Sequence, residues 1–204
     1  MFNNNEVVSY ETILSSIPLP ELIKIIPDAP KIVLNAVNKL KANSFFVVNI
    51  GVNRPNITDK NWIYFLEREF SFVRVSFPFN QSDNVAPSGT SSISAEIAYG
   101  YNNSLPVSKE LMLDHVINEL INANIIDASD EIIYSSTVDI KYAYVIFDNE
   151  RKSAIKIIHD YLKKFDIIPF GRYGMWAYLW SDEAMLSGKK VAERLVKLDT
   201  MNSA

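Results

Sequence analysis

Four strand-like runs follow one another in the middle of the chain, at residues 44–52, 61–66, 71–77 and 91–101. Each run is rich in β-branched and aromatic residues. Clusters of Asn, Pro, Gly, Ser and Asp separate them, and these residue types favour turns. Consecutive strands with short polar connections pair most readily with their sequence neighbours. The sequence therefore predicts a mostly antiparallel sheet.

Helical segments surround these strands and predict the α+β class. Apolar residues recur at helical spacing at 31–43, at 108–121 with Ser108 as N-cap, and at 149–165. A strand at 6–17 leads into a short helix, Glu21 to Ile26, and 131–147 forms one long or two short strands. We expect a short strand at 166–171, a loop at 171–183 and a closing helix from Ala184.

Composition excludes several classes of protein. The 204 residues are 48% hydrophobic and 22% charged, which is typical of a globular chain. A net charge of -4 provides no basic field for nucleic acid. The chain has no cysteine, so disulfides and thiolate metal sites are excluded, and no apolar stretch is long enough to span a membrane. These features predict a soluble cytoplasmic protein.

The segment from Pro169 to Ala184 carries the most chemical information. It joins a strand end, Gly171 where the backbone can approach a ligand closely, and Arg172, whose guanidinium can grip a phosphate. An aromatic stretch follows, and then the N-terminus of a helix with free amide donors. These features together suit a flat, anionic ligand.

The same segment resembles the C-terminal flavin motif of the amine oxidase and protoporphyrinogen oxidase superfamily of FAD-dependent oxidoreductases, and that of UDP-galactopyranose mutase. The resemblance rests on the GR-x-G sequence at a strand end, the aromatic residues after it, and a small-residue step from Gly188 to Ala192. It implies that Gly171 and Arg172 lie along the FAD diphosphate and ribityl chain. The cofactor-binding residues that it implies are Gly171, Arg172, Trp176, Asp182, Glu183, Ala184 and Met185, with the amides of the last three facing the flavin.

Looser similarities extend the resemblance over most of the chain. Ser15 to Leu19 is similar to the strand of this superfamily that returns to the FAD domain, and Trp62 to Phe65 is similar to its substrate-domain sheet. The resemblance implies three parts: a partial FAD-domain strand and linker at 1–30, a substrate-binding-like domain at 31–165, and a C-terminal fringe of an α/β FAD domain at 166–204. The substrate-binding residues would be Tyr64, Arg74, Tyr142, Tyr144 and Tyr178.

The dinucleotide fingerprint of such enzymes, G-x-G-x-x-G, is absent, because the six glycines are at 51, 89, 100, 171, 174 and 188. The sequence therefore predicts a fragment, or a chain that an N-terminal FAD-domain polypeptide completes. We expect it to be inactive alone, to bind FAD weakly or not at all, and to form a homo-oligomer through the apolar surface that is left exposed. The sequence identifies neither the catalytic residues nor the substrate.

Simpler interpretations stay open at this stage. Arg172 could form a surface salt bridge, and the aromatic residues 176–180 could serve packing alone. Arg74 could face solvent on an alternating strand, and Tyr142 and Tyr144 could be exposed edge residues. Two further functions also remain: a part of a flavin-dependent sugar-nucleotide mutase, with Tyr178 and Arg74 on the substrate diphosphate, or a non-catalytic binding module. His115 and His159 have no second ligand at helical spacing, which makes a metal role improbable.

Overall fold

The computed structural model describes residues 7–202 and divides the chain into two compact units. Unit 1 contains the residues up to Lys41 and those from Tyr144 onward, and unit 2 is Ala42–Ala143. The chain therefore enters unit 2 once and leaves it once. Unit 2 is shorter at both ends than the segment 31–165 expected as a substrate domain, since the helices on either side of it belong to unit 1.

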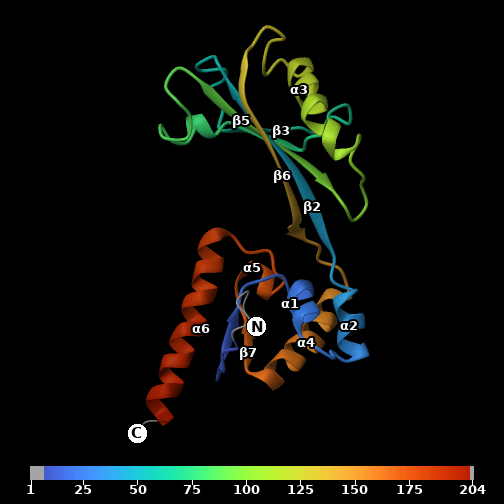
Figure 1. Ribbon diagram of the computed structural model, residues 1–204, viewed down its shortest axis with the longest axis vertical. Helices are drawn as coiled ribbons and strands as arrows, with labels where there is room; N and C mark the ends of the chain where they lie inside the picture. Colours follow the sequence, from blue (N-terminus) through green and yellow to red (C-terminus); the bar gives the residue numbers. More distant parts are fainter. Residues whose placement is uncertain (1–6, 203–204) are drawn as a thin grey trace. The chain divides into compact units, whose positions relative to one another are not determined.

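Unit 2 is built on a five-stranded sheet in the order β3-β4-β5-β2-β6 (Figure 1). Its strands are β2 (Ala42–Val52), β3 (Trp62–Tyr64), β4 (Arg74–Ser76), β5 (Ser91–Tyr99) and β6 (Ile132–Val145). The pairs β2–β5, β3–β4 and β4–β5 are antiparallel. The predicted antiparallel sheet is thus confirmed, and the segment expected to form one or two strands is the single long strand β6.

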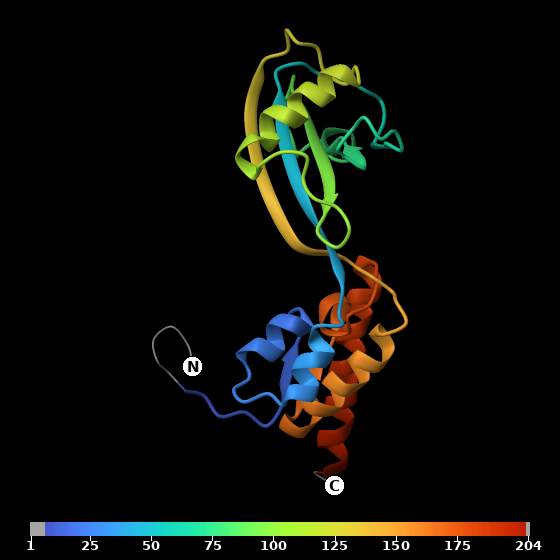
Figure 2. The same ribbon diagram turned by 90° about the vertical axis from the view of Figure 1, so that its right-hand side faces the viewer.

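One face of this sheet is buried under a helix and the other is open. Along β5, Ile93, Ala95 and Ile97 alternate with the polar residues between them, and the apolar set lies in the core. Helix α3 (Met112–Asn122) covers this apolar face with Met112 and Val116, after a 3-10 turn, η2 (Lys109–Leu111) (Figures 1 and 2). A second 3-10 turn, η1 (Pro78–Asn80), follows β4. The opposite face is left to the polar residues.

Unit 1 combines a two-stranded parallel sheet with helices. Strand β1 (Ile13–Ser15) pairs with β7 (Ile167–Pro169), and Ile13 lies opposite Ile167. The helices are α1 (Leu19–Ile25), α2 (Lys31–Val37), α4 (Arg151–Leu162), α5 (Gly171–Gly174) and α6 (Ser181–Asn202), and the 3-10 turn η3 (Lys163–Phe165) precedes β7. With the sheet of unit 2, these elements confirm the α+β class.

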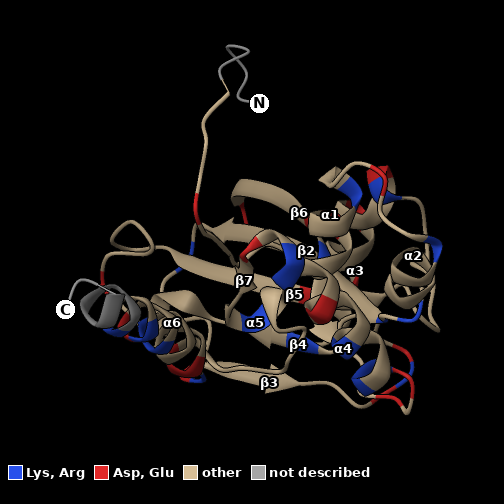
Figure 3. Ribbon diagram, turned by 90° about the horizontal axis from the view of Figure 1, so that it is seen from below, with Lys and Arg blue, Asp and Glu red and all other residues tan. Residues whose placement is uncertain are grey.

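Helices α1, α2, α4 and α6 of unit 1 lie near the expected positions, although some of their ends differ. Helix α2 ends at Val37 instead of near residue 43, because the chain becomes β2 from Ala42. Helix α6 begins at Ser181, three residues before the expected start. Charged residues of both signs occur along α6 (Figure 3), and Lys189 Nζ lies 3.8 Å from Glu193 Oε1. Among the described residues, no helix is long and apolar enough to cross a bilayer.

Candidate functional site

The local structure requires each of the two glycines in the GRYG segment. Instead of the expected loop, residues 171–174 form α5 directly after β7. Gly171 begins this turn with a φ of 69°, in the left-handed region that favours glycine. A Cβ atom on Gly174 would lie 2.6 Å from the carbonyl oxygen of Ser15. The two glycines thus allow the chain to turn tightly against the end of β1.

Helix α6 packs against this turn. The Gly171 amide donates to Ser187 Oγ at 3.0 Å, so this amide is already engaged within unit 1. Gly188 lies against the ring of Phe170, where a Cβ atom would come within 3.3 Å. The small-residue step expected from the sequence therefore lets α6 approach Phe170 closely.

Arg172 lies with two tyrosines that come from separate segments of the chain. Its guanidinium carbon is 5.1 Å from the ring centre of Tyr144 and 4.9 Å from that of Tyr178, within the range of cation–π contact. The two rings stack with centres 5.5 Å apart. Arg172 Nη1 also donates to the Leu179 carbonyl at 3.0 Å. One predicted cofactor residue and two predicted substrate residues therefore meet in a single cluster, which we call the Arg172 cluster.

The aromatic stretch after α5 divides into a buried part and an exposed part. Trp176 is fully buried, with a φ of 48°. Its carbonyl accepts hydrogen bonds from Arg151 Nε, at 2.8 Å, and from Arg151 Nη2. Tyr178 is 43% exposed and Trp180 is 69% exposed, with their rings edge to face. Trp176 therefore packs in the core of unit 1, while Tyr178 and Trp180 present aromatic surface to solvent.

Sequence reasoning missed the role of Arg151. Its guanidinium lies 3.9 Å from the ring centre of Phe147, and it anchors the chain 25 residues further on through the Trp176 carbonyl. Burial lowers the pKa of Arg151, and the charge of Asp148 opposes that shift. Nothing in the local sequence signals a contact over such a separation.

The amides in the first turn of α6 are not the three that the sequence predicted. Glu183 Oε2 accepts from the Trp180 amide at 2.8 Å, an arrangement typical of a helix N-cap. The Ala184 amide donates to the Trp180 carbonyl at 2.9 Å, so it is a helical hydrogen bond and not a free donor. Because α6 begins at Ser181, its first-turn amides are those of residues 181–183, with Asp182 among them. Met185 lies past this turn and is largely exposed.

The open face of unit 2 holds the other predicted substrate residues. Tyr64, Arg74 and Glu96 lie opposite one another across β3, β4 and β5. Arg74 Nη2 hydrogen-bonds to Glu96 Oε1, and the arginine lies 5.9 Å from the Tyr64 ring centre. The hydrogen bond to Glu96 is the main cause of a raised pKa for Arg74. The charge of Arg74 is therefore already balanced by a carboxylate.

Tyr142 and Tyr144 were both expected to contact the substrate. Both lie on β6, but Tyr142 belongs to unit 2 and Tyr144 to unit 1. Tyr142 is half-buried beside Lys141, whose Nζ is 5.0 Å from its ring centre. Of these two tyrosines, Tyr144 is the one whose ring lies against Arg172 and Tyr178 in the Arg172 cluster.

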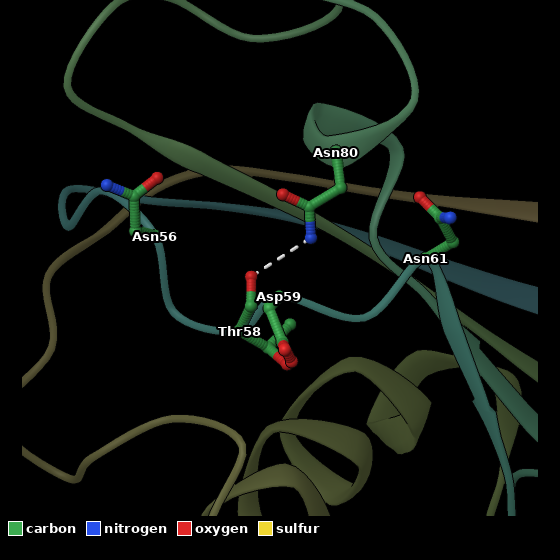
Figure 4. Close-up of a pocket in the computed structure, with 5 residues that line it drawn as sticks. All are labelled: Asn56, Thr58, Asp59, Asn61 and Asn80. Carbon is green, nitrogen blue, oxygen red and sulfur yellow. Dashed lines mark hydrogen bonds between the residues drawn. The ribbon is translucent and has the colours of Figure 1, made fainter.

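A polar pocket of about 500 Å³ lies in the loop between β2 and β3 (Figure 4). Asn80 closes one side, and its amide donates to the carbonyls of Thr58, at 3.0 Å, and Lys60, at 2.6 Å. Asp59 in the same loop pairs with Lys60 at 2.8 Å. The polar side chains at this position thus brace the loop against η1.

The two histidines have structural partners. His159 Nε2 lies 3.3 Å from the Gly174 carbonyl, and His115 Nε2 lies 3.2 Å from Glu119 Oε1. Glu119 also accepts from the Ser71 amide at 2.8 Å, which ties α3 to the chain before β4. Among the side chains described, those of residues 7–197, no group of three or more His, Asp or Glu is arranged to hold a metal ion.

No family model matches the chain. Among solved structures, a reduced UDP-galactopyranose mutase matches 87% of this chain, with a TM-score of 0.77 and 24% identity. A protoporphyrinogen oxidase-like protein from Exiguobacterium sp. 255-15 matches 90% of it, with a TM-score of 0.68 and 15% identity. This chain shares the fold of part of each protein. The resemblance that the sequence indicated is therefore confirmed at the level of fold.

The match covers only part of these proteins. The chain spans 38% of the length of the mutase structure and 40% of the length of the protoporphyrinogen oxidase-like structure. The match therefore concerns the architecture of the two units and not a whole enzyme.

Proposed function

We propose that the chain is the C-terminal portion of an FAD-dependent oxidoreductase of the amine oxidase and protoporphyrinogen oxidase type. The observation that carries this proposal is the Arg172 cluster, which joins a cation and two stacked phenol rings beside the helix that follows the GRYG turn. The fold shared with UDP-galactopyranose mutase and with the protoporphyrinogen oxidase-like protein supports it.

The residues of unit 1 fit the flavin end of FAD. Arg172 would stabilise the anionic chain of the cofactor, and the exposed rings of Tyr178 and Trp180 would lie against its flat parts. The first-turn amides of α6, residues 181–183, would face the pyrimidine edge of the flavin. Trp176 would not contact the cofactor; its buried ring would fix the backbone of the aromatic stretch. When bound, the flavin supplies the redox chemistry by accepting hydride or electrons from the substrate.

The adenosine end of FAD needs a binding site that this chain does not provide. The chain lacks the glycine fingerprint on which the diphosphate of such cofactors rests. We propose that a dinucleotide-binding portion completes the site, whether it belongs to the same polypeptide or to another one. We place the complete protein in the cytoplasm, because a chain without cysteine gains nothing from an oxidising compartment.

Unit 2 would contribute the substrate contacts. Tyr64 and Arg74 lie on its open sheet face, which carries polar and aromatic side chains and is not covered by α3. Because Glu96 balances the charge of Arg74, this row suits a substrate that is neutral there.

A flavin spectrum tests this proposal. The 204-residue chain alone should purify colourless, because losing the diphosphate cradle removes several factors of ten in affinity, each of about 1.4 kcal/mol. Addition of the dinucleotide-binding portion and FAD should give a yellow complex with stoichiometric flavin. A complex that stays colourless would contradict the proposal and favour a non-catalytic binding module.

A second candidate is a flavin-dependent sugar-nucleotide mutase, favoured by the higher TM-score with the mutase structure. Tyr178 and Arg74 would then contact the substrate diphosphate. The pairing of Arg74 with Glu96 weighs against this role, because a carboxylate next to the arginine repels a diphosphate. Tighter binding of uridine diphosphate to the reduced yellow complex in a Glu96→Gln variant would support the mutase reading.

A further inference from the structure

A cavity of about 430 Å³ opens on the uncovered face of the unit 2 sheet, at the C-terminal end of β2. The segment between η1 and β5 forms one wall, with Val85, Ala86 and Pro87. The sheet forms the floor, and Tyr134 of β6 forms the opposite wall. Its volume lies within the range of small-molecule pockets, roughly 300–1,000 Å³. None of the residues assigned above to FAD or substrate lines this cavity.

Gly51 accounts for the space in the floor. In the sheet, Gly51 lies opposite Ser92 of β5, and a Cβ atom added to it would lie 3.1 Å from Cβ of Tyr134. Every other residue type would therefore fill the gap between β5 and β6. The missing side chain leaves a depression that the residues Ser92 and Tyr134 border.

Ser92 is a buried hydroxyl that no neighbour satisfies. Its Oγ atom has no hydrogen-bond partner among residues 7–202. The adjoining hydroxyls do have partners, because Ser94 Oγ donates to Asn49 Oδ1 at 2.9 Å and Thr90 Oγ1 donates to the Pro87 carbonyl at 2.7 Å. A buried polar group without a partner is costly, so Ser92 favours a ligand that brings one.

The lining determines the charge of that ligand. No Asp, Glu, Lys, Arg or His side chain borders the cavity, and the wall is mostly apolar. A charged molecule would lose its hydration there without gaining a counter-charge. A neutral molecule with a flat apolar body would instead cover the Tyr134 ring and the residues Val85 and Pro87.

We infer that this cavity binds a neutral, flat, mainly apolar small molecule that makes one hydrogen bond to Ser92. The inference goes beyond the proposed function, because it needs neither FAD nor the dinucleotide-binding portion. It assigns to unit 2 a ligand site of its own, separate from the row of Tyr64, Arg74 and Glu96.

Binding of aminoanthracene to the full chain tests the inference. This fluorophore is flat and neutral and carries one hydrogen-bonding amine, and its emission rises in apolar surroundings. We expect saturable binding of one molecule per chain. Ser92→Ala should weaken binding about fivefold, the value of one modest hydrogen bond. Ala86→Phe should fill the cavity and weaken binding by about tenfold or more.

Two controls make the test decisive. Ser88→Ala changes an exposed serine of the same segment that does not line the cavity, and it should leave binding unchanged. Circular dichroism should show native folding for all three variants, and if Ala86→Phe misfolds, Ser92→Ala decides alone. Absence of saturable binding, or equal binding in wild type and Ser92→Ala, overturns the inference. Equal binding of the anion anthracene sulfonate overturns the assignment of a neutral ligand.

Discussion

His159 shows how a single half-buried side chain links α4 to the GRYG turn. Its Nε2 atom lies 3.3 Å from the Gly174 carbonyl oxygen, to which the Nε2–H tautomer donates a hydrogen bond, and the side chain is half-buried. Burial lowers its pKa below the ordinary value of 6.5, while the Gly174 carbonyl and Asp160 oppose that shift. The neutral ring is therefore the form that unit 1 accommodates.

This shift predicts a pH dependence of stability. Because the folded-state pKa lies below the unfolded value, the unfolded chain binds the proton more readily. The contribution of His159 to the free energy of unfolding should be at its maximum above about pH 6.5. It should be lost as the pH falls through the folded-state pKa. Urea unfolding at several pH values measures it. The variant His159→Gln, which cannot titrate, should lose this slope, and an unchanged slope would contradict the assignment.

At the level of elements, the close contact between α5 and β1 should be sensitive to one methyl group. Gly174→Ala would place Cβ 2.6 Å from the backbone oxygen of Ser15, and neither backbone can yield without disturbing the β1–β7 pair. We expect a loss of about 1–3 kcal/mol of unfolding free energy in urea, the usual cost of overpacking.

Gly89→Asn is the matched control for Gly174→Ala. Gly89 has a φ of 82°, and no atom lies within 4 Å of an added Cβ. Asparagine tolerates the left-handed region, so the change should stay within about 0.5 kcal/mol. Equal losses in the two variants would show that the contact with Ser15 is not what requires glycine at position 174.

The sequence predicted the elements whose pattern is long and regular. Strands β2 and β5 are runs of nine or more residues beside turn-forming clusters, and α4 carries apolar residues at helical spacing over three turns, so these patterns were sufficient. Helix α5 could not be read in this way, because four residues with two glycines show no period. The earlier start of α6 had a signal that was overlooked, the acidic first turn of Asp182 and Glu183.

The sequence predicted which residues belong to the candidate site better than it predicted their contacts. Motif similarity singled out Arg172, Tyr144 and Tyr178, which do meet. Motif similarity did not indicate that Ser187 Oγ would accept a hydrogen bond from the Gly171 amide. Nor did it indicate that Glu96 would balance the charge of Arg74. These contacts depend on packing between distant elements, which a single sequence does not encode locally.

At the scale of the whole molecule, unit 1 exposes apolar surface that favours association. Leu14 is 43% exposed and Met185 is 76% exposed. A groove of about 620 Å³ beside β1 is lined by further apolar side chains, among them Ile17 and Ile25. Within the described residues, β1 pairs with β7 alone, so the parallel pair has open edges. Such a surface is typical of one that another chain covers.

We therefore predict that the chain alone self-associates into a symmetric dimer. Light scattering should report a mass above 23.2 kDa that falls on dilution. The double variant Leu14→Lys with Met185→Lys should shift the protein to monomer, because it places charge in the contact. Leu66→Lys, at a 91% exposed position of unit 2, should not change the mass. A mass of 23.2 kDa at every concentration would contradict the prediction.

Flavin occupancy after dialysis of the yellow complex tests most directly whether the Arg172 cluster binds the cofactor. Arg172→Ala should lower FAD affinity roughly tenfold or more, the value of a charge-assisted hydrogen bond, and so reduce occupancy. Arg74→Ala removes the same side chain from unit 2, where Glu96 balances it, and should retain flavin as the wild type does. Higher occupancy in Arg74→Ala than in Arg172→Ala is the predicted result, and equal occupancy in the two variants would contradict the account.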